Sequence, residues 1–116
     1  MSDNTDIPTV SVSDLGEDER ILDVRTHEEW AAGHTPGARN SPLRSLGTSL
    51  GNLDINERIP VICRSGGRSS QAVEFLRKEG FDAINVDGGM KAWAEADKAM
   101  VSENDEDPHV SDSPSH

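Results

Sequence analysis

The sequence has one cysteine, no tyrosine, two tryptophans and two phenylalanines among 116 residues. A single cysteine cannot form an internal disulfide, which agrees with a reducing compartment or with a thiol that has a chemical role. Hydrophobic residues make up only 33% of the chain, so we expect part of it to lie outside the core. The length suits one domain of ordinary size and excludes two.

Positive charge is also scarce, with 11 Lys and Arg against 22 Asp and Glu, for a net charge of −11. Phosphate backbones bind clustered basic side chains, so nucleic acid is disfavoured as a partner. No apolar run approaches the roughly 18 residues of a membrane span. The first residues, MSDNTDIP, lack the basic and apolar regions of a secretory signal. We therefore expect a cytoplasmic protein with no nucleic-acid and no membrane partner.

The two ends hold most of the negative charge. Residues 97–116 carry six acidic residues and one lysine, and residues 1–8 carry two acidic residues and no basic one. These contributions of −5 and −2 leave −4 of the net −11 for residues 9–96. We therefore expect a disordered N-terminus over 1–8, one folded domain over 9–96 and an acidic disordered tail over 97–116, with a docking peptide as the alternative for the tail.

Short β-branched runs alternate with helix signals along residues 9–96. The strand candidates are TVSV at 9–12, RILDV at 20–24, PVIC at 60–63 and AINVD at 83–87. RILDV and PVIC are too short for buried helices and too uniformly apolar for a half-solvated hairpin. They are therefore predicted to be central strands of a parallel sheet that is covered on both faces. This alternation is typical of an α/β fold.

Two helices carry clear boundary signals. Thr26 and Glu29 form a capping box for HEEWAA, which Gly33 can end. The segment SSQAVEFLRK at 69–78 has an apolar face, basic residues in its last turn and Gly80 as a C-terminal cap. Glycines interrupt the pattern over 42–56, where we expect one short helix followed by a loop.

Polar and small residues follow three of the strand candidates. Cys63 ends PVIC, Asp23 and Arg25 come at the end of RILDV, and residues 87–89 (DGG) follow the last candidate. Ligands of open parallel sheets bind at the carboxyl ends of the strands. We therefore expect these three strand ends to meet at one site.

The surroundings of Cys63 favour chemistry over packing. Gly66 and Gly67 allow consecutive N–H groups to curl inward as an anion-binding nest, and the following helix adds its positive N-terminus. Arg64 and Arg68 add formal charge. Such a ring suits a thiolate, a persulfide or the oxyanion of a substrate. The alternative, an inert buried thiol, requires neither the glycines nor the arginines.

Three sequence blocks stand out along the predicted domain: ILDVRTHEEWAAGHTPGARNSPL at 21–43, CRSGGRS at 63–69 and NVDGGMKAW at 85–93. These blocks resemble the single-domain rhodaneses of the thiosulfate sulfurtransferase family. The blocks occur in the family's order and spacing, and the resemblance covers roughly residues 9–96. It implies an α/β, rhodanese-like fold with a five-stranded, mostly parallel sheet and helices on both faces.

The resemblance also implies a mechanism in which Cys63 is the catalytic nucleophile and carries a sulfane sulfur as a persulfide. A small molecule such as thiosulfate, or a protein, would donate the sulfur, and cyanide, a thiol or a protein would accept it, with no cofactor. Residues 64–68 would form the cradle around the sulfur, and Arg64 and Arg68 would attract the anionic donor. Because Arg68 starts the helix beneath the cradle, we expect it to hold the loop and Arg64 to face the donor. The implied substrate-binding residues are Arg64, Ser65, Gly66, Gly67 and Arg68.

Two other functions remain as alternatives. A cysteine phosphatase or arsenate reductase on a related fold has a five-residue spacer between cysteine and arginine, whereas Cys63 and Arg68 are separated by four residues. The loop is thus one residue short for a phosphate, and Ile62 replaces the usual histidine. The second alternative is a non-catalytic persulfide carrier or regulatory module, which the sequence leaves open.

Other polar residues are interpreted as structural. We expect Asp23 and Arg25 to cap and to form an ion pair with Glu28 or Glu29 rather than to contact substrate. His34, within GHTPG, is expected to serve a turn or packing. The remaining histidines have no metal-ligand spacing with each other or with Cys63, so no metal site is expected.

Overall fold

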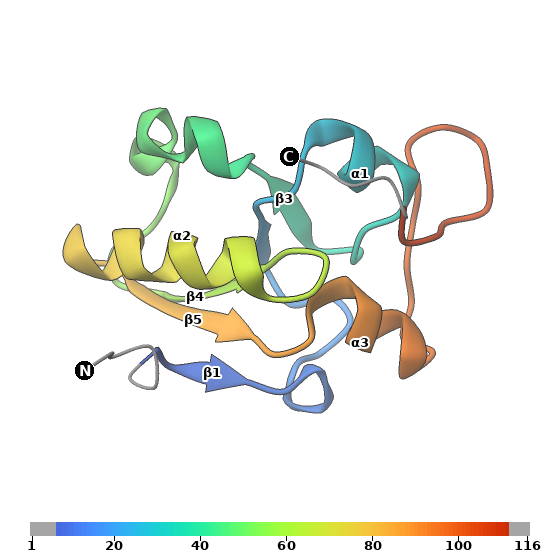
Figure 1. Cartoon of the computed structure of the whole chain (residues 1–116), viewed down its shortest axis with the longest axis horizontal. Coiled ribbons are helices and arrows are strands. Elements are labelled where there is room, and N and C mark those ends of the chain that lie inside the picture. Colours follow the sequence, from blue (N-terminus) through green and yellow to red (C-terminus); the bar gives the residue numbers. More distant parts are fainter. Residues whose placement is uncertain (1–6, 112–116) are drawn as a thin grey trace.

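The computed structural model describes residues 7–111, which form one five-stranded parallel sheet (Figure 1). The strands are β1 (Thr9–Val10), β2 (Ile21–Asp23), β3 (Ala38–Asn40), β4 (Arg58–Ile62) and β5 (Asp82–Val86). Their order across the sheet is β1-β5-β4-β2-β3, and every pairing is parallel. The predicted parallel sheet, with RILDV and PVIC as central strands, is confirmed.

The strand β3 is absent from the candidates found by residue pattern. Its sequence is Ala-Arg-Asn, and it pairs only with β2 at the edge of the sheet. None of its three residues is fully buried. A short polar edge strand has no apolar alternation, so only the family resemblance implied a fifth strand.

Helices cover both faces of the sheet. On one face, α2 (Gly67–Lys78) runs alongside β4 and β5, with the 3-10 helix Leu43–Thr48 beside it (Figure 1). The apolar side of α2, with Ala72, Val73 and Leu76, is completely buried there. The 3-10 helix Val12–Asp14 and α3 (Gly89–Glu95) pack with the second apolar cluster, which contains the buried Trp93.

The predicted boundaries agree with the structure for α1 (His27–Ala32) and for the end of α2, whereas α2 begins at Gly67, two residues before the predicted start. The helix α1 begins with the full capping box, in which Thr26 accepts from the Glu29 N–H and Glu29 accepts from the Thr26 N–H. After α2, Gly80 has a φ of +97°, and the Phe81 N–H donates to the Leu76 carbonyl at 3.0 Å. The region 42–56 differs in containing two 3-10 helices, Leu43–Thr48 and Leu50–Asn52, in place of one helix.

The C-terminal segment 97–111 differs from the expected disordered tail. It turns back from α3 to α1 (Figure 1), where Val101 forms an antiparallel bridge with His34. Glu103 donates its N–H to the Ala31 carbonyl at 2.8 Å. Met100 and Val110 pack on the second apolar cluster. Residues 112–116 and 1–6 lie outside the described residues, and at the other end Ile7 already packs on the first cluster.

The C-terminal segment is ordered because a few of its residues bind to the end of α1, although most of its side chains are acidic or polar. The short helix α1 leaves carbonyl groups without intrahelical partners at its end, and backbone N–H groups of the segment bind two of them, at Ala31 and Ala32. The acidic side chains of Asp105, Glu106 and Asp107 stay exposed. The acidic composition of this segment therefore accounts for its exposed side chains but does not indicate that its backbone binds to α1.

Removal of residues 98–116 is expected to lower the Tm by roughly 5–15 °C. The deletion strips Met100 and Val110 from the core and removes the Ala99 carbonyl that accepts from the buried Trp93 indole at 2.9 Å. Together these losses correspond to about 1–3 kcal/mol. Thermal denaturation followed by circular dichroism measures the change.

A charge control separates these contacts from the loss of acidic residues. Replacement of Glu106 and Asp107 by glutamine and asparagine removes two exposed negative charges and should leave the Tm within about 2 °C. An unchanged Tm in the truncated protein would show that the segment adds no stability.

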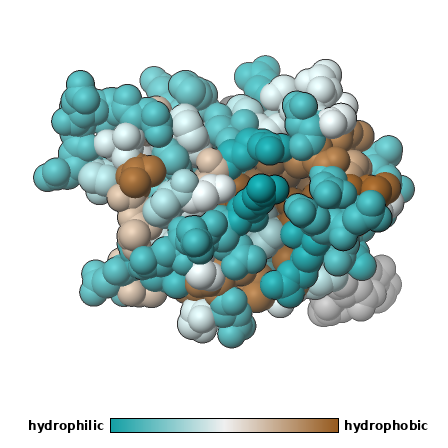
Figure 2. All heavy atoms as spheres, turned by 180° about the vertical axis from the view of Figure 1, so that it is seen from behind, coloured by the Kyte–Doolittle hydropathy of each residue, from teal (hydrophilic) through white to brown (hydrophobic). Residues whose placement is uncertain are grey.

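The surface is mostly hydrophilic. Figure 2 shows a face on which hydrophilic residues form most of the surface, with hydrophobic residues visible mainly on the right of the view. Among residues 7–111, the exposed large hydrophobic residues are Ile55 and Val101. Within the same range, no helix combines the length and the apolar composition that crossing a membrane requires.

Candidate active site

Cys63 lies immediately after β4, at the base of a tight loop that leads into α2. Its side chain is buried, and its Sγ accepts a hydrogen bond from the Gly66 N–H at 3.0 Å. This bond requires the chain to reverse within three residues, and Gly66 has a φ of +116°, a conformation that favours glycine. Gly67 differs from the expectation, because its φ lies outside the left-handed region and it simply begins α2.

The first turn of α3 packs against the backbone of the Cys63 loop. The N–H groups of Met90 and Lys91 donate to the carbonyls of Cys63 and Arg64 at 2.8 and 3.0 Å. These bonds hold both carbonyls away from the sulfur. A Cβ on Gly89 would lie 2.4 Å from the Cys63 carbonyl oxygen, so this contact needs glycine. The predicted meeting of this strand end with the cysteine is therefore present.

Arg68 anchors the start of α2 to α1. Its guanidinium forms a two-pronged bond with Glu29, with N–O distances of 2.7 and 3.0 Å. Glu29 is buried, so the pair is shielded from water on that side. The fork with Glu29 raises the pKa of Arg68 above its ordinary value, and the Cys63 sulfur acts in the same direction when charged. Arg68 therefore remains cationic beside the loop.

Asp23 and Arg25 form a separate, completely buried ion pair. The Arg25 Nη2 donates to the Asp23 carboxylate at 2.7 Å and to the Gly33 carbonyl at 2.8 Å. The expected structural role agrees with this burial, but the expected partner is wrong. Arg25 pairs with Asp23, two residues before it, and Glu29 pairs with Arg68 instead. Sequence distance gave no indication of the second pair, which joins residues 39 positions apart.

Two buried residues beside the sulfur were missed by the sequence analysis. The Ser69 Oγ lies 3.3 Å from the Cys63 Sγ, and it donates to the Asn85 Oδ1 at 2.5 Å. Asn85 is an inward-facing polar residue of β5. A buried asparagine in an otherwise apolar strand was the signal that could have indicated it.

Arg64 lies on the outer side of the loop and contacts the C-terminal segment. Its Nε donates to the Ser111 carbonyl at 3.0 Å. Ser65 and Gly67 are exposed, whereas Arg64 and Gly66 are partly buried. The five residues expected to bind substrate thus span the loop and the first residues of α2, where Arg68 is already engaged by Glu29.

His34 is buried at the junction of α1 with the C-terminal segment. Its ring stacks on Trp30 with centroids 4.1 Å apart, and its Nε2 lies 2.9 Å from the Glu103 carboxylate. These contacts correspond to the predicted packing role. Among residues 7–111, no three His, Cys, Asp or Glu side chains are grouped so that they could hold a metal ion.

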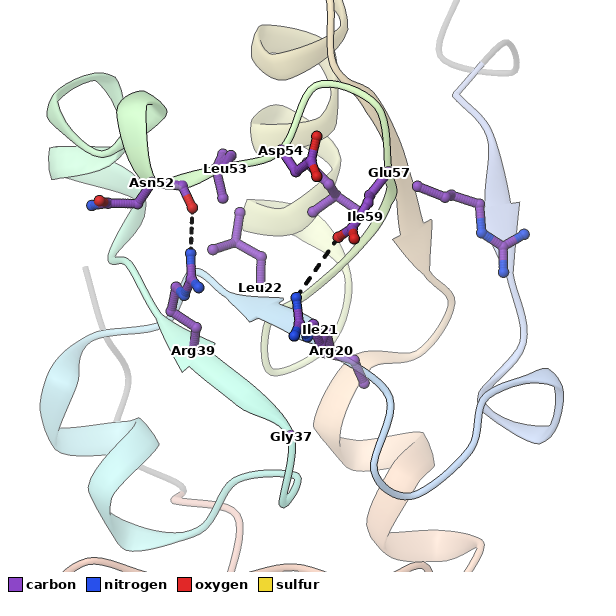
Figure 3. Close-up of a pocket in the computed structure, with 11 residues that line it drawn as sticks. Arg20, Ile21, Leu22, Gly37, Arg39, Asn52, Leu53, Asp54, Glu57 and Ile59 are labelled. Atoms are coloured by element: carbon purple, nitrogen blue, oxygen red, sulfur yellow. Dashed lines mark hydrogen bonds and ion pairs between the residues drawn. The ribbon is translucent and has the colours of Figure 1, made fainter.

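A cavity of about 330 Å³ lies at the opposite edge of the sheet, where β2 and β4 begin (Figure 3). Three of its charged side chains have partners within the cavity lining. Arg39 donates to the Asn52 carbonyl at 2.6 Å, and Arg20 lies 4.0 Å from Glu57. No residue of the Cys63 loop lines this cavity. The carboxyl ends of the strands therefore remain the candidate site.

A model of the rhodanese-like domain family matches residues 10–96. The match covers most of the chain, and the protein therefore belongs to the rhodanese-like domain family. This finding confirms the family resemblance and the α/β fold that it implied. Sulfur transfer is thus the general chemistry of its family.

Individual relatives agree with this classification. A Bacillus subtilis (strain 168) protein named "Putative sulfur carrier protein YrkF" is 38% identical over 94 residues, which are 75% of this chain and 51% of the relative. The crystal structure of a rhodanese-related protein from Thermoplasma volcanium has a TM-score of 0.76 at 32% identity, covering 81% of this chain and 97% of that chain. A rhodanese-like domain protein from Staphylococcus aureus gives 0.67 at 35% identity, with coverages of 75% and 91%. The chain spans about half the length of the curated relative.

Proposed function

We propose that the protein is a sulfurtransferase that carries a sulfane sulfur as a persulfide on Cys63. The observation that carries this proposal is the position of the Cys63 Sγ, buried inside the loop and bonded to the Gly66 N–H at 3.0 Å. A sulfur held by an amide donor at the start of a helix is stabilised as an anion. The helix α2, with 12 residues, is long enough to contribute its N-terminal partial charge.

Two displacement steps at sulfur complete the reaction. In the first, the Cys63 thiolate attacks the outer sulfur of thiosulfate, the S–S bond of the donor breaks, and sulfite leaves with the electron pair. In the second, cyanide attacks the outer sulfur of the persulfide, and the Cys63 thiolate leaves as thiocyanate forms. Total charge is conserved in each step, and neither step consumes an oxidant, a reductant or a cofactor.

Local positive charge favours an anionic donor on this acidic protein. Arg64 and Arg68 lie in the loop itself, although the whole chain has a net charge of −11. Arg68 is held by Glu29, so it acts mainly on loop geometry and on the charge of the sulfur. Arg64, on the outer side of the loop, is the side chain that we assign to attraction of the donor.

The same contacts favour sulfur over phosphate. A phosphatase loop of this kind uses its arginine to grip the phosphate oxygens. Here both prongs of the Arg68 guanidinium are bonded to Glu29, and the loop is one residue shorter than the phosphatase spacer. A cradle of this size is better suited to one additional sulfur atom than to a tetrahedral anion.

The second candidate function is a persulfide carrier that delivers sulfur to a protein. The name of the B. subtilis relative, a sulfur carrier, supports this candidate, and the relative is about twice as long as the matching region, with 51% of it covered. The chemistry at Cys63 is the same in both cases, and the acceptor differs. Fast turnover with cyanide favours an enzyme, whereas slow turnover with fast transfer to a protein thiol favours a carrier. For either function we propose a cytoplasmic location, because thiols stay reduced there.

Mass spectrometry of the intact protein tests the proposal. Treatment with thiosulfate alone should add one sulfur atom to the protein, because the chain has no second cysteine to resolve the persulfide. Subsequent addition of cyanide should restore the original mass and release one equivalent of thiocyanate. The matched control is Cys63→Ser, which should gain no sulfur while its thermal denaturation stays cooperative. The proposed persulfide on Cys63 would be refuted if Cys63→Ser gained a sulfur atom, or if the native protein gained none.

A further inference from the structure

We propose that Ser69 is a catalytic residue whose hydroxyl hydrogen moves between Asn85 and the Cys63 sulfur as that sulfur loses and gains charge. The kinetic part of this proposal rests on the persulfide cycle proposed above. The acid–base part concerns only the thiol and stands without it. Ser69 would thereby stabilise the inner sulfur each time it is a thiolate.

The geometry forms a continuous chain of hydrogen bonds that is buried from Cys63 to Asn85 and partly buried beyond it. From the Cys63 Sγ it runs 3.3 Å to the Ser69 Oγ and then 2.5 Å to the Asn85 Oδ1. From there the Asn85 Nδ2 donates to the Ser70 Oγ at 3.2 Å, and Ser70 donates to the Gly66 carbonyl at 2.7 Å. Ser69 has no exposed surface, so water does not substitute for these partners.

One hydroxyl hydrogen serves more than one acceptor in this chain. A serine hydroxyl has a single hydrogen but accepts two bonds. When the sulfur of Cys63 is a thiol, its S–H donates to the Ser69 Oγ, and the hydroxyl hydrogen points to the Asn85 oxygen at 2.5 Å. The Gly66 carbonyl is a more distant acceptor for the same hydrogen, at 3.2 Å. A thiolate has no hydrogen and only accepts. The same 3.3 Å contact then favours the Ser69 O–H pointing at the sulfur.

Asn85 can satisfy both arrangements. A half-turn of its amide group presents its NH₂ to the Ser69 Oγ and its oxygen to the Ser70 hydroxyl. The Ser70 hydroxyl hydrogen then moves from the Gly66 carbonyl to the Asn85 oxygen, and the Gly66 carbonyl keeps its bond from the Ser70 N–H at 3.1 Å. Each of these polar groups therefore keeps a partner when the Ser69 hydroxyl turns to the sulfur. The network thus has two complete forms, one for a neutral sulfur and one for an anionic sulfur, and the charge on Cys63 selects between them.

The persulfide distinguishes this role from general loop support. In the persulfide the negative charge lies on the outer sulfur, and the Cys63 Sγ that Ser69 contacts is neutral. Ser69 therefore stabilises the free thiolate more than it stabilises the persulfide. Discharge to the acceptor expels this thiolate as its leaving group, and a better stabilised thiolate leaves faster. Ser69 is therefore expected to accelerate mainly the second half-reaction, in which the Cys63 thiolate is the leaving group.

The first test is the alkylation of Ser69→Ala by iodoacetamide as a function of pH. Without the hydroxyl, we expect about tenfold less thiolate at neutral pH, so the alkylation profile moves about one pH unit to the alkaline side. Ser69→Thr keeps the hydroxyl and should restore the native profile. The matched control is Ser41→Ala, since Ser41 is also buried but its hydroxyl bonds to Ser49. Native-like alkylation in Ser69→Ala, or an equal displacement in Ser41→Ala, would overturn the proposal.

The second test separates the two half-reactions at a pH where the thiol is fully ionised. In Ser69→Ala, loading from thiosulfate should be as fast as in the native protein or up to about threefold faster, because a more basic thiolate is a better nucleophile. Discharge of the preloaded persulfide to cyanide should be about threefold slower or more. A merely structural loss would slow both steps together and would contradict the assignment. If the native protein forms no persulfide, the proposed function fails, whereas the alkylation profiles still decide the role of Ser69.

Discussion

Arg68→Lys is expected to lose at least about 90% of the thiosulfate:cyanide turnover although it keeps its positive charge. Lysine offers a single charged nitrogen and cannot form the two-pronged bond with Glu29. The loop that starts α2 then loses its anchor to α1. Arg68→Ala should destabilise folding further, by about 2–4 kcal/mol, because it leaves the buried Glu29 carboxylate without its cation. Steady-state kinetics and denaturant unfolding measure the two effects.

A double-mutant cycle shows whether the fork itself is responsible. Glu29→Gln and Arg68→Lys should each lower stability, and together they should lower it by about 1 kcal/mol less than the sum. The control is Arg20→Lys, since Arg20 is exposed and lies 4.0 Å from its carboxylate partner Glu57. That substitution should leave stability and turnover nearly unchanged. Additive effects in the cycle, or full activity in Arg68→Lys, would contradict the two-pronged bond and show that Arg68 acts only through its positive charge.

Local sequence signals were sufficient for most elements of the fold. Thr26 and Glu29 specify the start of α1 because both halves of a capping box lie within four residues. The apolar runs at β2 and β4 specify central strands because neither face of these strands meets water. Gly80 specifies the end of α2 through its left-handed backbone. In each case the interaction joins residues that are close in sequence.

The features that were missed depend on residues far apart in sequence. Glu29 serves the capping box and also receives Arg68. A residue with two partners is indistinguishable in the sequence from one with a single partner. The C-terminal segment depends in the same way on carbonyls of α1 that become available only after folding. Its acidic composition therefore predicted solvation, although its backbone and a few apolar side chains are docked.

The sequence predicted the candidate nucleophile, but it did not predict most of the residues that hold this nucleophile in place. Cys63 stood out as the only cysteine, placed between a strand and a glycine-containing loop. The residues that hold it come from three other parts of the chain: α1, β5 and the first turn of α3. Among these, the glycine pair at 88–89 was visible in the sequence, but its physical task was not. That task is a close approach between two backbones.

Gly89→Ala should lower the Tm by roughly 10 °C or more and remove most of the persulfide loading. Its Cβ would lie 2.4 Å from the Cys63 carbonyl oxygen and 2.7 Å from that of Arg64, and its φ is +56°. Both carbonyls belong to rigid backbone, so the loop must move away and lose its bonds from Met90 and Lys91. The left-handed backbone adds about 1–2 kcal/mol of strain. Loop movement then displaces the amide that holds the sulfur.

Gly67→Ala is the matched control, because it makes the same change in the same active-site region. A Cβ on Gly67 meets no atom within 4 Å, and its backbone is outside the left-handed region. Alanine at the first position of α2 should therefore keep the Tm or raise it slightly, through about 0.5–1 kcal/mol of helix preference. Thermal denaturation and mass spectrometry after thiosulfate treatment compare the two variants directly. Equal behaviour would mean that the close approach at Gly89 does not position the loop, since only that variant forces the backbone of Cys63 to move.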